Sequence, residues 1–264
     1  MKAAGVGRKW GQHFLRSRST VEKILRAASL SEDDRVLEIG PGEGVLTLEL
    51  CRQAGRVHAF EVDPALAQAL REKKIENLLV HEGDFLQQDP AACLGSDARD
   101  LVVVANLPYY ITAPIMEKLF WQRPVPVGKG ILMMQEEVAQ RICGPASRQA
   151  GALTYITGAF FEAEYLFKVP PGCFSPPPKV DSAVIALRPR PWSFNPTTSQ
   201  TALYERLVST AFQARRKQLT RSLRAVHPDI AQTLEKAGID PRRRPETLEV
   251  QEFWEIARKL DPYE

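Results

Sequence analysis

Short apolar runs alternate with helical patterns through the first half of the chain. Runs typical of buried strands lie at residues 36–39, 57–62, 78–81 and 101–105. Helical patterns begin near Val45 and Pro64, between the first three of these runs. Strands that alternate with helices form βαβ units, in which parallel strands pair and helices cover both faces of the sheet. The pattern therefore predicts a doubly wound α/β fold.

An amphipathic helix is predicted ahead of the first strand, over residues 20–29. Apolar residues recur there at i, i+3, i+4 and i+7 from Val21, which places them on one helical face. Ser19 and Glu22 have the spacing of a capping box, so we expect the helix to begin at Ser19.

The rest of the chain divides into late strands, a linker and a helical end. Apolar runs at 131–135, 159–169 and 183–187 predict strands, the last two as an antiparallel pair at the sheet edge. Prolines mix with small polar residues over 188–199, which marks a linker. The periodicity is helical from about residue 192 to the end, and this predicts a small all-helical domain.

The composition is that of an ordinary globular protein, with 44% hydrophobic and 25% charged residues among 264. No apolar run approaches the roughly 18 residues of a membrane span, and the first residues lack a signal-peptide core. We therefore expect a soluble, cytoplasmic protein. The cysteine spacing matches no metal or redox motif, so we expect no metal site and buried, inert thiols at Cys51, Cys93, Cys143 and Cys173.

The distribution of charge is more informative than the net charge of +3. Residues 1–21 contain five cations and no carboxylate, and residues 206–224 contain six cations and no carboxylate. A helical wheel over 206–224 places an apolar face opposite a cationic face. Although such a face is often only solvated surface, its lack of carboxylates favours a polyanionic partner.

A glycine-rich loop follows the first predicted strand in the segment Glu38-Ile-Gly-Pro-Gly-Glu-Gly44. A doubly wound fold binds nucleotide-like ligands at this position, where glycine permits a tight turn and close approach of the backbone. The dinucleotide pattern G-x-G-x-x-G fails because Val45 stands where the third glycine belongs. Pyrophosphate binding is therefore disfavoured, and no phosphate-binding loop of the G-x-x-x-x-G-K-[ST] type supports nucleotide hydrolysis.

Two acidic residues follow at the next strand ends. Glu61 ends the second strand, 21 residues after Gly40, where a carboxylate can accept hydrogen bonds from both ribose hydroxyls. Asp84 follows the third strand and can accept from an adenine amino group, while Val62 and Phe85 offer apolar surface to the ring. Either carboxylate alone has a plain explanation as a solvated strand end. The glycine loop, Glu61 and Asp84 follow three successive strands, and together they favour a ligand that contains an adenosine without phosphates.

The fourth strand ends in Asn106-Leu-Pro-Tyr109, at the same edge of the sheet. The exocyclic amine of adenine is a poor nucleophile because its lone pair is delocalised into the ring. The Asn106 side-chain oxygen and the Leu107 carbonyl could each accept one N–H of this amine. The lone pair of the nitrogen would then be released from the ring and could attack an electrophile. Pro108 stiffens the backbone, and Tyr109 offers a face for base stacking worth roughly 1–3 kcal/mol.

The chain resembles the small-subunit ribosomal RNA adenine N6,N6-dimethyltransferase family almost end to end. The matching segments are Gly11-Gln-His-Phe-Leu15, Glu38-Ile-Gly-Pro-Gly42, Glu61-Val-Asp63, Gly83-Asp84, Asn106-Leu-Pro-Tyr109, Phe174-Ser-Pro-Pro-Pro-Lys-Val-Asp-Ser182 and Phe212-Gln-Ala-Arg-Arg-Lys-Gln-Leu219. The resemblance implies a Rossmann-like S-adenosylmethionine-dependent methyltransferase domain with a basic N-terminal arm over residues 1–190, and a helical RNA-binding domain over 191–264. It also implies dimethylation of two adjacent adenosines in a hairpin near the 3′ end of 16S rRNA, in the 30S subunit or its precursor, by a monomer.

The resemblance also implies roles for individual residues. Those expected around the cofactor S-adenosylmethionine are Gln12, His13, Leu15, Gly40, Glu61, Val62, Asp84, Phe85 and Asn106. Those expected around the target adenine are Asn106, Leu107, Pro108, Tyr109 and Phe174, with Phe174 and Tyr109 on opposite faces of the base. The family usually has asparagine at position 13 and often at position 110, where this chain has His13 and Tyr110.

RNA phosphates are expected on the cationic segment, at Arg215, Arg216, Lys217 and Arg221. Residues 242–244 form a second, weaker candidate patch. Three alternatives stay open: a large-subunit rRNA adenine methyltransferase of the macrolide-resistance type, a DNA adenine methylase, and a non-catalytic RNA-binding assembly factor. The segments at 174–182 and 215–217 argue against the first, and the absence of a sequence-reading DNA module argues against the second.

Overall fold

The computed structural model describes residues 12–95, 100–123, 125–144, 150–192 and 194–261. Most cations of the predicted N-terminal arm, Lys2, Arg8 and Lys9, lie outside the described residues. The chain divides into two compact units, residues 1–139 with 163–189 and residues 140–162 with 190–264.

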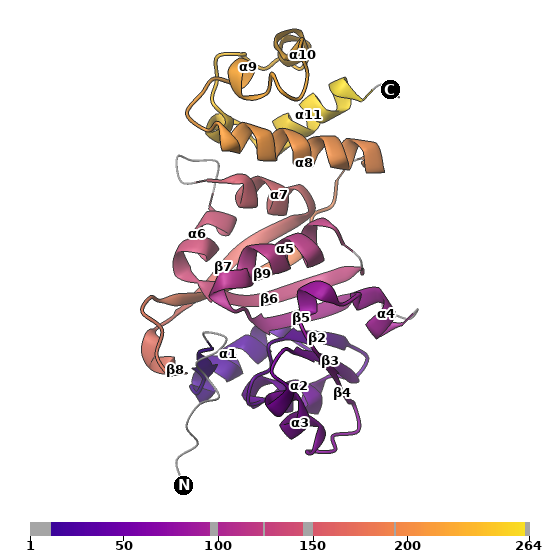
Figure 1. Cartoon of the computed structure of the whole chain (residues 1–264), viewed down its shortest axis with the longest axis vertical. Coiled ribbons are helices and arrows are strands. Elements are labelled where there is room, and N and C mark those ends of the chain that lie inside the picture. The colour runs from indigo at the N-terminus through magenta and orange to yellow at the C-terminus, as the bar shows by residue number, and fades with distance from the viewer. Residues whose placement is uncertain (1–11, 96–99, 124, 145–149, 193, 262–264) are drawn as a thin grey trace. The chain divides into compact units, whose positions relative to one another are not determined.

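The first unit is built on a seven-stranded sheet in the order β4-β3-β2-β5-β6-β9-β7 (Figure 1). Its strands are β2 (Arg35–Ile39), β3 (Arg56–Glu61), β4 (Leu78–Glu82), β5 (Leu101–Asn106), β6 (Val127–Gln135), β7 (Phe161–Val169) and β9 (Ser182–Pro189). The first five strands in this order pair in parallel, and β9 is antiparallel to β6. A separate antiparallel pair joins β1 (Phe14–Leu15) to β8 (Phe174–Ser175).

Helices connect the parallel strands as predicted. They are α2 (Val45–Gln53), α3 (Pro64–Arg71), α4 (Pro90–Leu94) and α5 (Thr112–Met116), while α1 (Arg18–Ala28) precedes β2 and α6 (Glu136–Cys143) follows β6. Shorter helical turns are η1 (Phe85–Gln87), η2 (Tyr109–Ile111), the π-helical η3 (Glu117–Trp121) and η4 (Pro171–Cys173).

Both faces of the sheet are buried, as the doubly wound pattern predicts. Val36 and Val104 belong to a core that also contains the apolar residues of α1 and α2. Leu37 and Val103, which alternate with them along the same strands, are also fully buried. The near-continuous apolar runs of β2 and β5 thus reflect their central position in the sheet.

The first helix begins earlier than its sequence pattern predicts. The N-cap is Ser17, whose Oγ accepts a hydrogen bond from the Thr20 backbone at 3.3 Å. Ser19 therefore lies inside the helix, and Glu22 forms an ion pair with Arg18 instead of closing a capping box. The expected cap at Ser19 is wrong because an equivalent serine stands two residues earlier.

The predicted pair of edge strands is confirmed. β7 ends the sheet with β9 beside it. Glu164 pairs with Arg188 and Lys168 pairs with Asp181, so residue numbers rise on one strand as they fall on the other. The strand predicted at 159–169 begins at Phe161, because the two residues before it end a helix.

Helices dominate the second unit, which begins before the predicted boundary at residue 190. Its helices are α7 (Ala152–Phe160), α8 (Thr198–Gln213), α9 (Leu219–Ser222), α10 (Ile230–Lys236), α11 (Val250–Leu260) and the turn η5 (Pro245–Thr247). The apolar sequence of α7 does not distinguish a buried helix from a buried strand, and sequence analysis did not identify it as a helix.

The predicted linker has no helix or strand between β9 and α8 in its described residues, and it is held by side-chain contacts. Trp192 donates from its indole N–H to the Ala159 carbonyl at 2.6 Å, and its ring packs edge-on against Trp254. Thr197 and Gln200 form a capping box that starts α8.

None of the described helices is long and apolar enough to cross a membrane. The four cysteines are free thiols and half-buried, which corrects the expectation that they are fully buried. Burial raises the pKa of the Cys51 thiol to about 11, so this thiol is unreactive at neutral pH.

A neutral histidine pair lies between β3 and β4. The rings of His58 and His81 stack with centroids 5.3 Å apart, and His58 Nδ1 lies 3.0 Å from His81 Nε2. One nitrogen must donate and the other accept, so the two rings cannot both carry a second proton while this contact is kept. Burial lowers the pKa of His58 to about 4, and the neighbouring His81, Arg56 and Arg35 add repulsion.

We predict that this pair makes stability depend on pH. Because the folded pKa of His58 is lower than its unfolded value of 6.5, its contribution is complete above pH 6.5 and is lost as pH falls toward 4. Unfolding by urea should show a loss of about 2–3 kcal/mol between pH 7.5 and 4.5 from this residue. His58→Phe should remove that part of the pH dependence; parallel curves for the two proteins would contradict the assignment.

Candidate functional site

A cavity of about 420 Å³ lies at the carboxyl ends of the four parallel strands β2, β3, β4 and β5. Its wall is formed by the residues that follow these strands, together with the segment 12–15. The expected site residues found in the wall are Gln12, His13, Leu15, Gly40, Glu61, Val62, Asp84, Phe85, Asn106, Leu107, Pro108 and Tyr109. The structure therefore brings together residues separated by almost a hundred positions in sequence.

The glycine loop after β2 requires glycine for two reasons. Gly40 and Gly42 both have positive φ, +68° and +58°. A Cβ on Gly42 would also lie only 2.9 Å from the ring of Phe14, so the ring of the N-terminal segment packs directly on the loop. The bare backbone of the loop thus forms one wall of the cavity.

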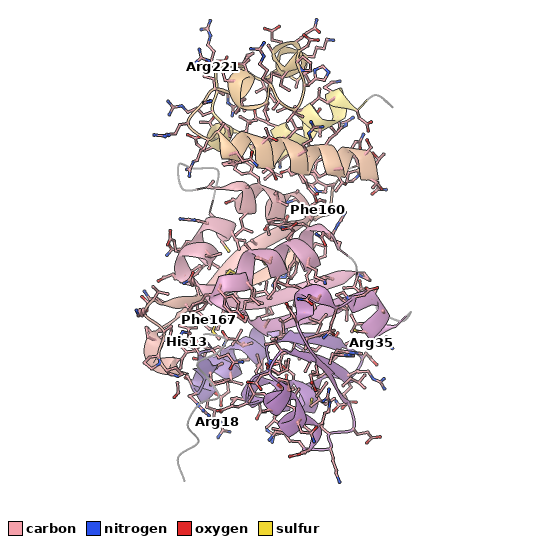
Figure 2. The ribbon with its side chains drawn as sticks, viewed as in Figure 1. His13, Arg18, Arg35, Phe160, Phe167 and Arg221 are labelled. Carbon is pink, nitrogen blue, oxygen red and sulfur yellow. The ribbon has the colours of Figure 1, made fainter. Side chains whose placement is uncertain are left out.

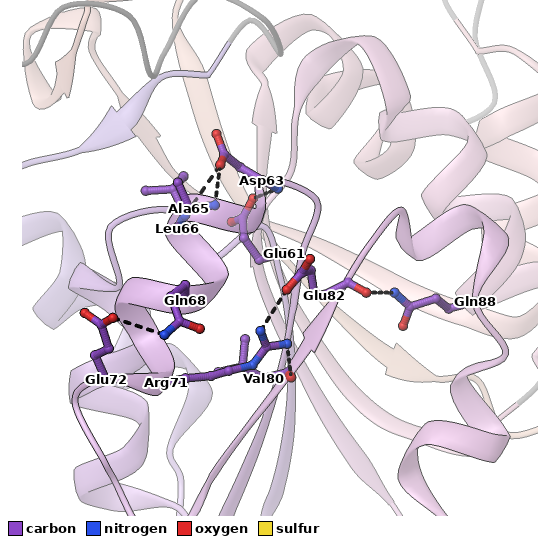
Figure 3. Close-up of polar contacts among 10 residues, drawn as sticks. All are labelled: Glu61, Asp63, Ala65, Leu66, Gln68, Arg71, Glu72, Val80, Glu82 and Gln88. Carbon is purple, nitrogen blue, oxygen red and sulfur yellow. Dashed lines mark hydrogen bonds and ion pairs between the residues drawn. The ribbon is translucent and has the colours of Figure 1, made fainter.

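Glu61 joins the glycine loop to the end of β3. Its buried carboxylate accepts the backbone N–H of Gly42 at 2.9 Å. It also accepts the backbone N–H of Asp63 at 2.9 Å (Figure 3). Asp63 in turn caps α3 by accepting from the Ala65 backbone. Each carboxylate oxygen accepts one hydrogen bond here and can accept another, so Glu61 can still receive ribose hydroxyls.

The loop after β4 is held by a lysine that sequence analysis did not select. Asp84 caps η1 by accepting from the Leu86 backbone at 2.9 Å. Lys118 donates to the carbonyls of Leu86 and Gln88, and its ammonium lies 5.4 Å from the Phe85 ring centroid. Lys118 lies in η3, more than 30 residues away, so no local sequence signal could have identified it.

The N-terminal segment lies against the cavity through several contacts. Leu15 pairs with Phe174 in the β1–β8 ladder. Arg16 forms a two-pronged ion pair with Glu43 of the glycine loop, with distances of 2.5 and 2.8 Å. His13 Nδ1 lies 2.8 Å from the Pro176 carbonyl oxygen.

The side chain of Asn106 is oriented by a backbone carbonyl. Its Nδ2 donates to the His13 carbonyl oxygen at 3.2 Å. Because a carbonyl only accepts, the amide nitrogen must face His13, and Oδ1 is left to accept from another group. The Leu107 backbone N–H donates to Met133 at 2.9 Å, and no donor to the Leu107 carbonyl is found among the described residues.

Tyr109 is held at both ends. Its hydroxyl lies 2.5 Å from the buried Ser182 hydroxyl, and its ring stacks on His13 with centroids 5.8 Å apart. Burial raises the pKa of the Tyr109 phenol, so it stays neutral at physiological pH. Ser182 lies in the segment 174–182, whose resemblance to the family was the only sequence signal for this residue. The sequence did not predict that Ser182 would contact Tyr109.

Phe174 is not part of the cavity wall. It is 5% exposed and belongs to the core that contains the apolar side chains of α1 and Leu15. The expectation that Phe174 covers the target base opposite Tyr109 is therefore not met in this structure. Its pairing with Leu15 in the β1–β8 ladder accounts for the burial, and His13 is the ring found beside Tyr109.

The cavity is acidic. Its wall contains no lysine or arginine among the described residues, and its carboxyl groups belong to Glu38, Glu43, Glu61 and Asp84. Glu43 is paired with Arg16, and burial raises the pKa of Glu38 to about 8, so Glu61 and Asp84 are the carboxyl groups left to repel a pyrophosphate or attract a cationic ligand. This electrostatic pattern supports the earlier rejection of a dinucleotide.

Glu38 is the functional candidate that sequence analysis quoted but did not assign. It is 2% exposed, and its Oε2 has no hydrogen-bond partner among the described residues. Burial raises the pKa of this carboxyl to about 8, opposed by Thr47 and reinforced by Glu61. A buried carboxyl with one unpartnered oxygen on a cavity wall is suited to receive a cationic donor.

The basic residues of the second unit do not lie on one continuous helix. α8 ends at Gln213, residues 214–218 form a turn, and α9 begins at Leu219. The single amphipathic helix predicted over 206–224 is therefore wrong. The Leu219 backbone donates to the Arg243 carbonyl, and this contact with a distant segment accompanies the change of direction, which helical periodicity cannot predict.

The turn nevertheless leaves its cations unpaired. Arg216 and Lys217 are exposed, and Arg215 is half-exposed. Arg221, in the next helix, is also exposed (Figure 2). None of the four forms an ion pair within the described part of the chain. Residues 213–217 line a hollow of about 570 Å³.

Only part of the second candidate patch, residues 242–244, is free to bind RNA phosphates. Arg243 is committed to a two-pronged ion pair with Glu252, whereas Arg242 and Arg244 are exposed. Because residues 241 and 243 accept hydrogen bonds from the start of α9, these two exposed cations belong to the same side of the unit as Arg221.

Comparison with known proteins identifies a family. A family model described as "Ribosomal RNA adenine dimethylase" matches residues 6–261. "Ribosomal RNA small subunit methyltransferase A" of Syntrophotalea carbinolica is 38% identical, over 97% of this chain and 97% of that protein. The protein of the same name from Geobacillus thermodenitrificans is 39% identical, over 96% of this chain and 90% of that protein.

Solved structures agree on the fold. A dimethyladenosine transferase from Plasmodium falciparum has a TM-score of 0.78 and 25% identity, covering 92% of this chain and 96% of that chain. The 23S rRNA methyltransferase ErmE has a TM-score of 0.71 and 31% identity, covering 94% and 99%. The Rossmann-like α/β fold predicted from the sequence is therefore confirmed.

Proposed function

The chain belongs to the ribosomal RNA adenine dimethylase family, and from this premise we propose that it dimethylates N6 of two adjacent adenosines near the 3′ end of 16S rRNA. It is an rRNA adenine N6,N6-dimethyltransferase that acts in the biogenesis of the small ribosomal subunit. The proposal includes S-adenosylmethionine as methyl donor, and a monomer that acts in the cytoplasm on 16S rRNA within the 30S subunit or its precursor.

The orientation of Asn106 carries the proposal for the chemistry. Its amide nitrogen is bound to the His13 carbonyl, which leaves Oδ1 as an acceptor beside the cavity. The Leu107 carbonyl is the neighbouring acceptor, on a backbone that Pro108 stiffens. Two acceptors and no donor suit an amino group, and they would disfavour a keto oxygen at the same place.

The cavity fits S-adenosylmethionine on three observations. The glycine loop exposes bare backbone, the wall is acidic without a lysine or arginine among the described residues, and Glu38 is a buried carboxyl with an unpartnered oxygen. Glu61 would hold the ribose, Asp84 the adenine amino group, and Glu38 the ammonium of the methionine part. When bound, the cofactor supplies an electrophilic methyl group on a positively charged sulfur.

The protein's own groups then act mainly by positioning. Asn106 Oδ1 and the Leu107 carbonyl accept the two N–H groups of the target amine, so that its lone pair points away from the ring. Tyr109, held by Ser182 and His13, offers a rigid face to the base. No strong general base is needed, because the amine becomes acidic once it is alkylated and loses its proton to water.

The target adenosine must leave its base stack to reach this cavity, at a cost of a few kcal/mol. The unpaired cations Arg215, Arg216, Lys217 and Arg221 would bind phosphates of the surrounding RNA and offset that cost. The exposed Arg242 and Arg244 extend the same surface.

We expect labelled S-adenosylmethionine and immature small subunits to give N6,N6-dimethyladenosine in 16S rRNA with this protein. Asn106→Ala should lower turnover by at least a hundredfold, because it removes an acceptor that orients the reacting amine. Its affinity for the cofactor alone should change by less than about threefold, as measured by calorimetry.

Two results would contradict this assignment. Equal losses of turnover and cofactor affinity would show that Asn106 serves the cofactor rather than the amine. Methylation that appears on isolated large-subunit RNA, but not on small subunits, would favour the macrolide-resistance type of activity. An Asn106→Ala protein that still rescued ribosome maturation would reveal an additional role as an assembly factor.

Glu38 should make cofactor binding release a proton. Its pKa of about 8 leaves it mostly protonated at pH 7, and a neighbouring ammonium would favour the ionised form. Calorimetry at pH 7 in two buffers of different ionisation enthalpy should give a release approaching one proton. Glu38→Gln should abolish most of this release and remove the rise in affinity between pH 7 and 8; equal proton release by the two proteins would refute the role of Glu38.

The phosphate-binding role of the cationic turn predicts a change in salt dependence. Lys217→Ala combined with Arg221→Ala should reduce the slope of log K against log salt by about 1–2, with a uniform loss of affinity for RNA. Lys236→Ala combined with Lys259→Ala is the matched control, because it removes two exposed lysines from α10 and α11 of the same unit. Equal slopes for both double variants would exclude Lys217 and Arg221 from the RNA-binding surface.

A further inference from the structure

Tyr110 is an exposed aromatic residue on the wall of the cavity. Its side chain is 57% exposed, more than any other large hydrophobic side chain among the described residues. The other two exposed ones, Leu79 and Val180, do not line the cavity. An aromatic ring left open to solvent at a ligand cavity offers a surface that a ligand can cover.

Tyr109 and Tyr110 are adjacent in η2, and both line the cavity. Tyr109 reaches Ser182 and His13, on the side of the Asn106 acceptors. Tyr110 makes neither of these contacts among the described residues, and it shares the cavity wall with Glu61, which ends β3, and Asp84, which follows β4. Partial burial, reinforced by the charges of Asp84 and Glu61, raises the pKa of the Tyr110 phenol.

We propose that Tyr110 is a further residue of the cofactor site, whose ring covers the nucleoside held between Glu61 and Asp84. The inference rests on the proposed function, since it takes S-adenosylmethionine as the ligand of the cavity. Val62 and the buried Phe85 line the same cavity, so the ring of Tyr110 adds an apolar surface to a nucleoside site that already has two.

The ring, and not the hydroxyl, should provide most of the effect. The carboxylates of Glu61 and Asp84 already have backbone donors, whereas the flat ring of Tyr110 can stack on a purine or pack on a ribose. Tyr110→Phe keeps the ring, Tyr110→Ala removes it, and Tyr110→Asn introduces the residue often found in the family. These three variants separate the two contributions.

Calorimetric titration without RNA tests the inference. Tyr110→Ala and Tyr110→Asn should weaken binding of S-adenosylmethionine roughly tenfold, and Tyr110→Phe should stay within about twofold of the wild type. The nucleoside 5′-methylthioadenosine, which lacks the amino-acid part, should show the same loss. Leu79→Ala is the control, because it truncates an exposed apolar side chain of the same unit that does not line the cavity.

Unchanged cofactor affinity in Tyr110→Ala, with a higher KM for RNA, would assign the ring to the RNA and overturn the inference. A loss for S-adenosylmethionine without a loss for 5′-methylthioadenosine would also overturn it, since Tyr110 would then serve the methionine part. Failure of the wild-type protein to bind either compound would instead refute the cofactor in the proposed function. Thermal melting checks folding, and the exposure of Tyr110 predicts unchanged midpoints for its variants.

Discussion

The carboxylate of Glu61 is the contact on which the cavity depends. It ends β3, accepts from Gly42 of the loop after β2, and accepts from Asp63, which caps α3. One side chain therefore fixes the separation of two strand ends and the start of a helix. A carboxylate that is buried and bound to two backbone N–H groups is costly to move, so the wall that it supports is rigid. The glycine loop benefits from this support because three of its residues, Gly40, Gly42 and Gly44, have no side chain and adopt positive φ.

The same cavity achieves selectivity by charge as well as by shape. Rossmann-like sheets bind many adenosine-containing ligands at this edge, and most of them carry phosphates. Here Glu38, Glu43, Glu61 and Asp84 face a space that no lysine or arginine among the described residues lines. Phosphate-bearing nucleotides would be repelled, and a nucleoside that carries a sulfonium and an ammonium would be favoured. Many proteins with different ligands share this fold, whereas the acidic lining of the cavity suits the ligand of this reaction.

Much of this arrangement could be predicted because it follows from strand order. Parallel strands end at one edge, so Gly40, Glu61, Asp84 and Asn106 had to meet once the βαβ pattern was recognised. The errors concern contacts between segments that are distant in sequence. Periodicity extended a helix across 214–218, where the chain turns and the next helix contacts residues 241–243. Lys118 was missed because its partners, the carbonyls of Leu86 and Gln88, carry no side-chain signal.

The two-residue ladder between β1 and β8 bears on how the N-terminal segment is held against the cavity. Phe14 and Leu15 line the cavity, and their strand is paired with only two residues, in contrast to the long ladders of the main sheet. So short a ladder cannot hold the segment in place by itself. The position of residues 13–16 on the cavity therefore also depends on contacts outside the ladder, namely the ion pair of Arg16 with Glu43 and the hydrogen bond of Asn106 to the His13 carbonyl. The cavity wall is thus completed by a segment that belongs to none of the strands of the main sheet.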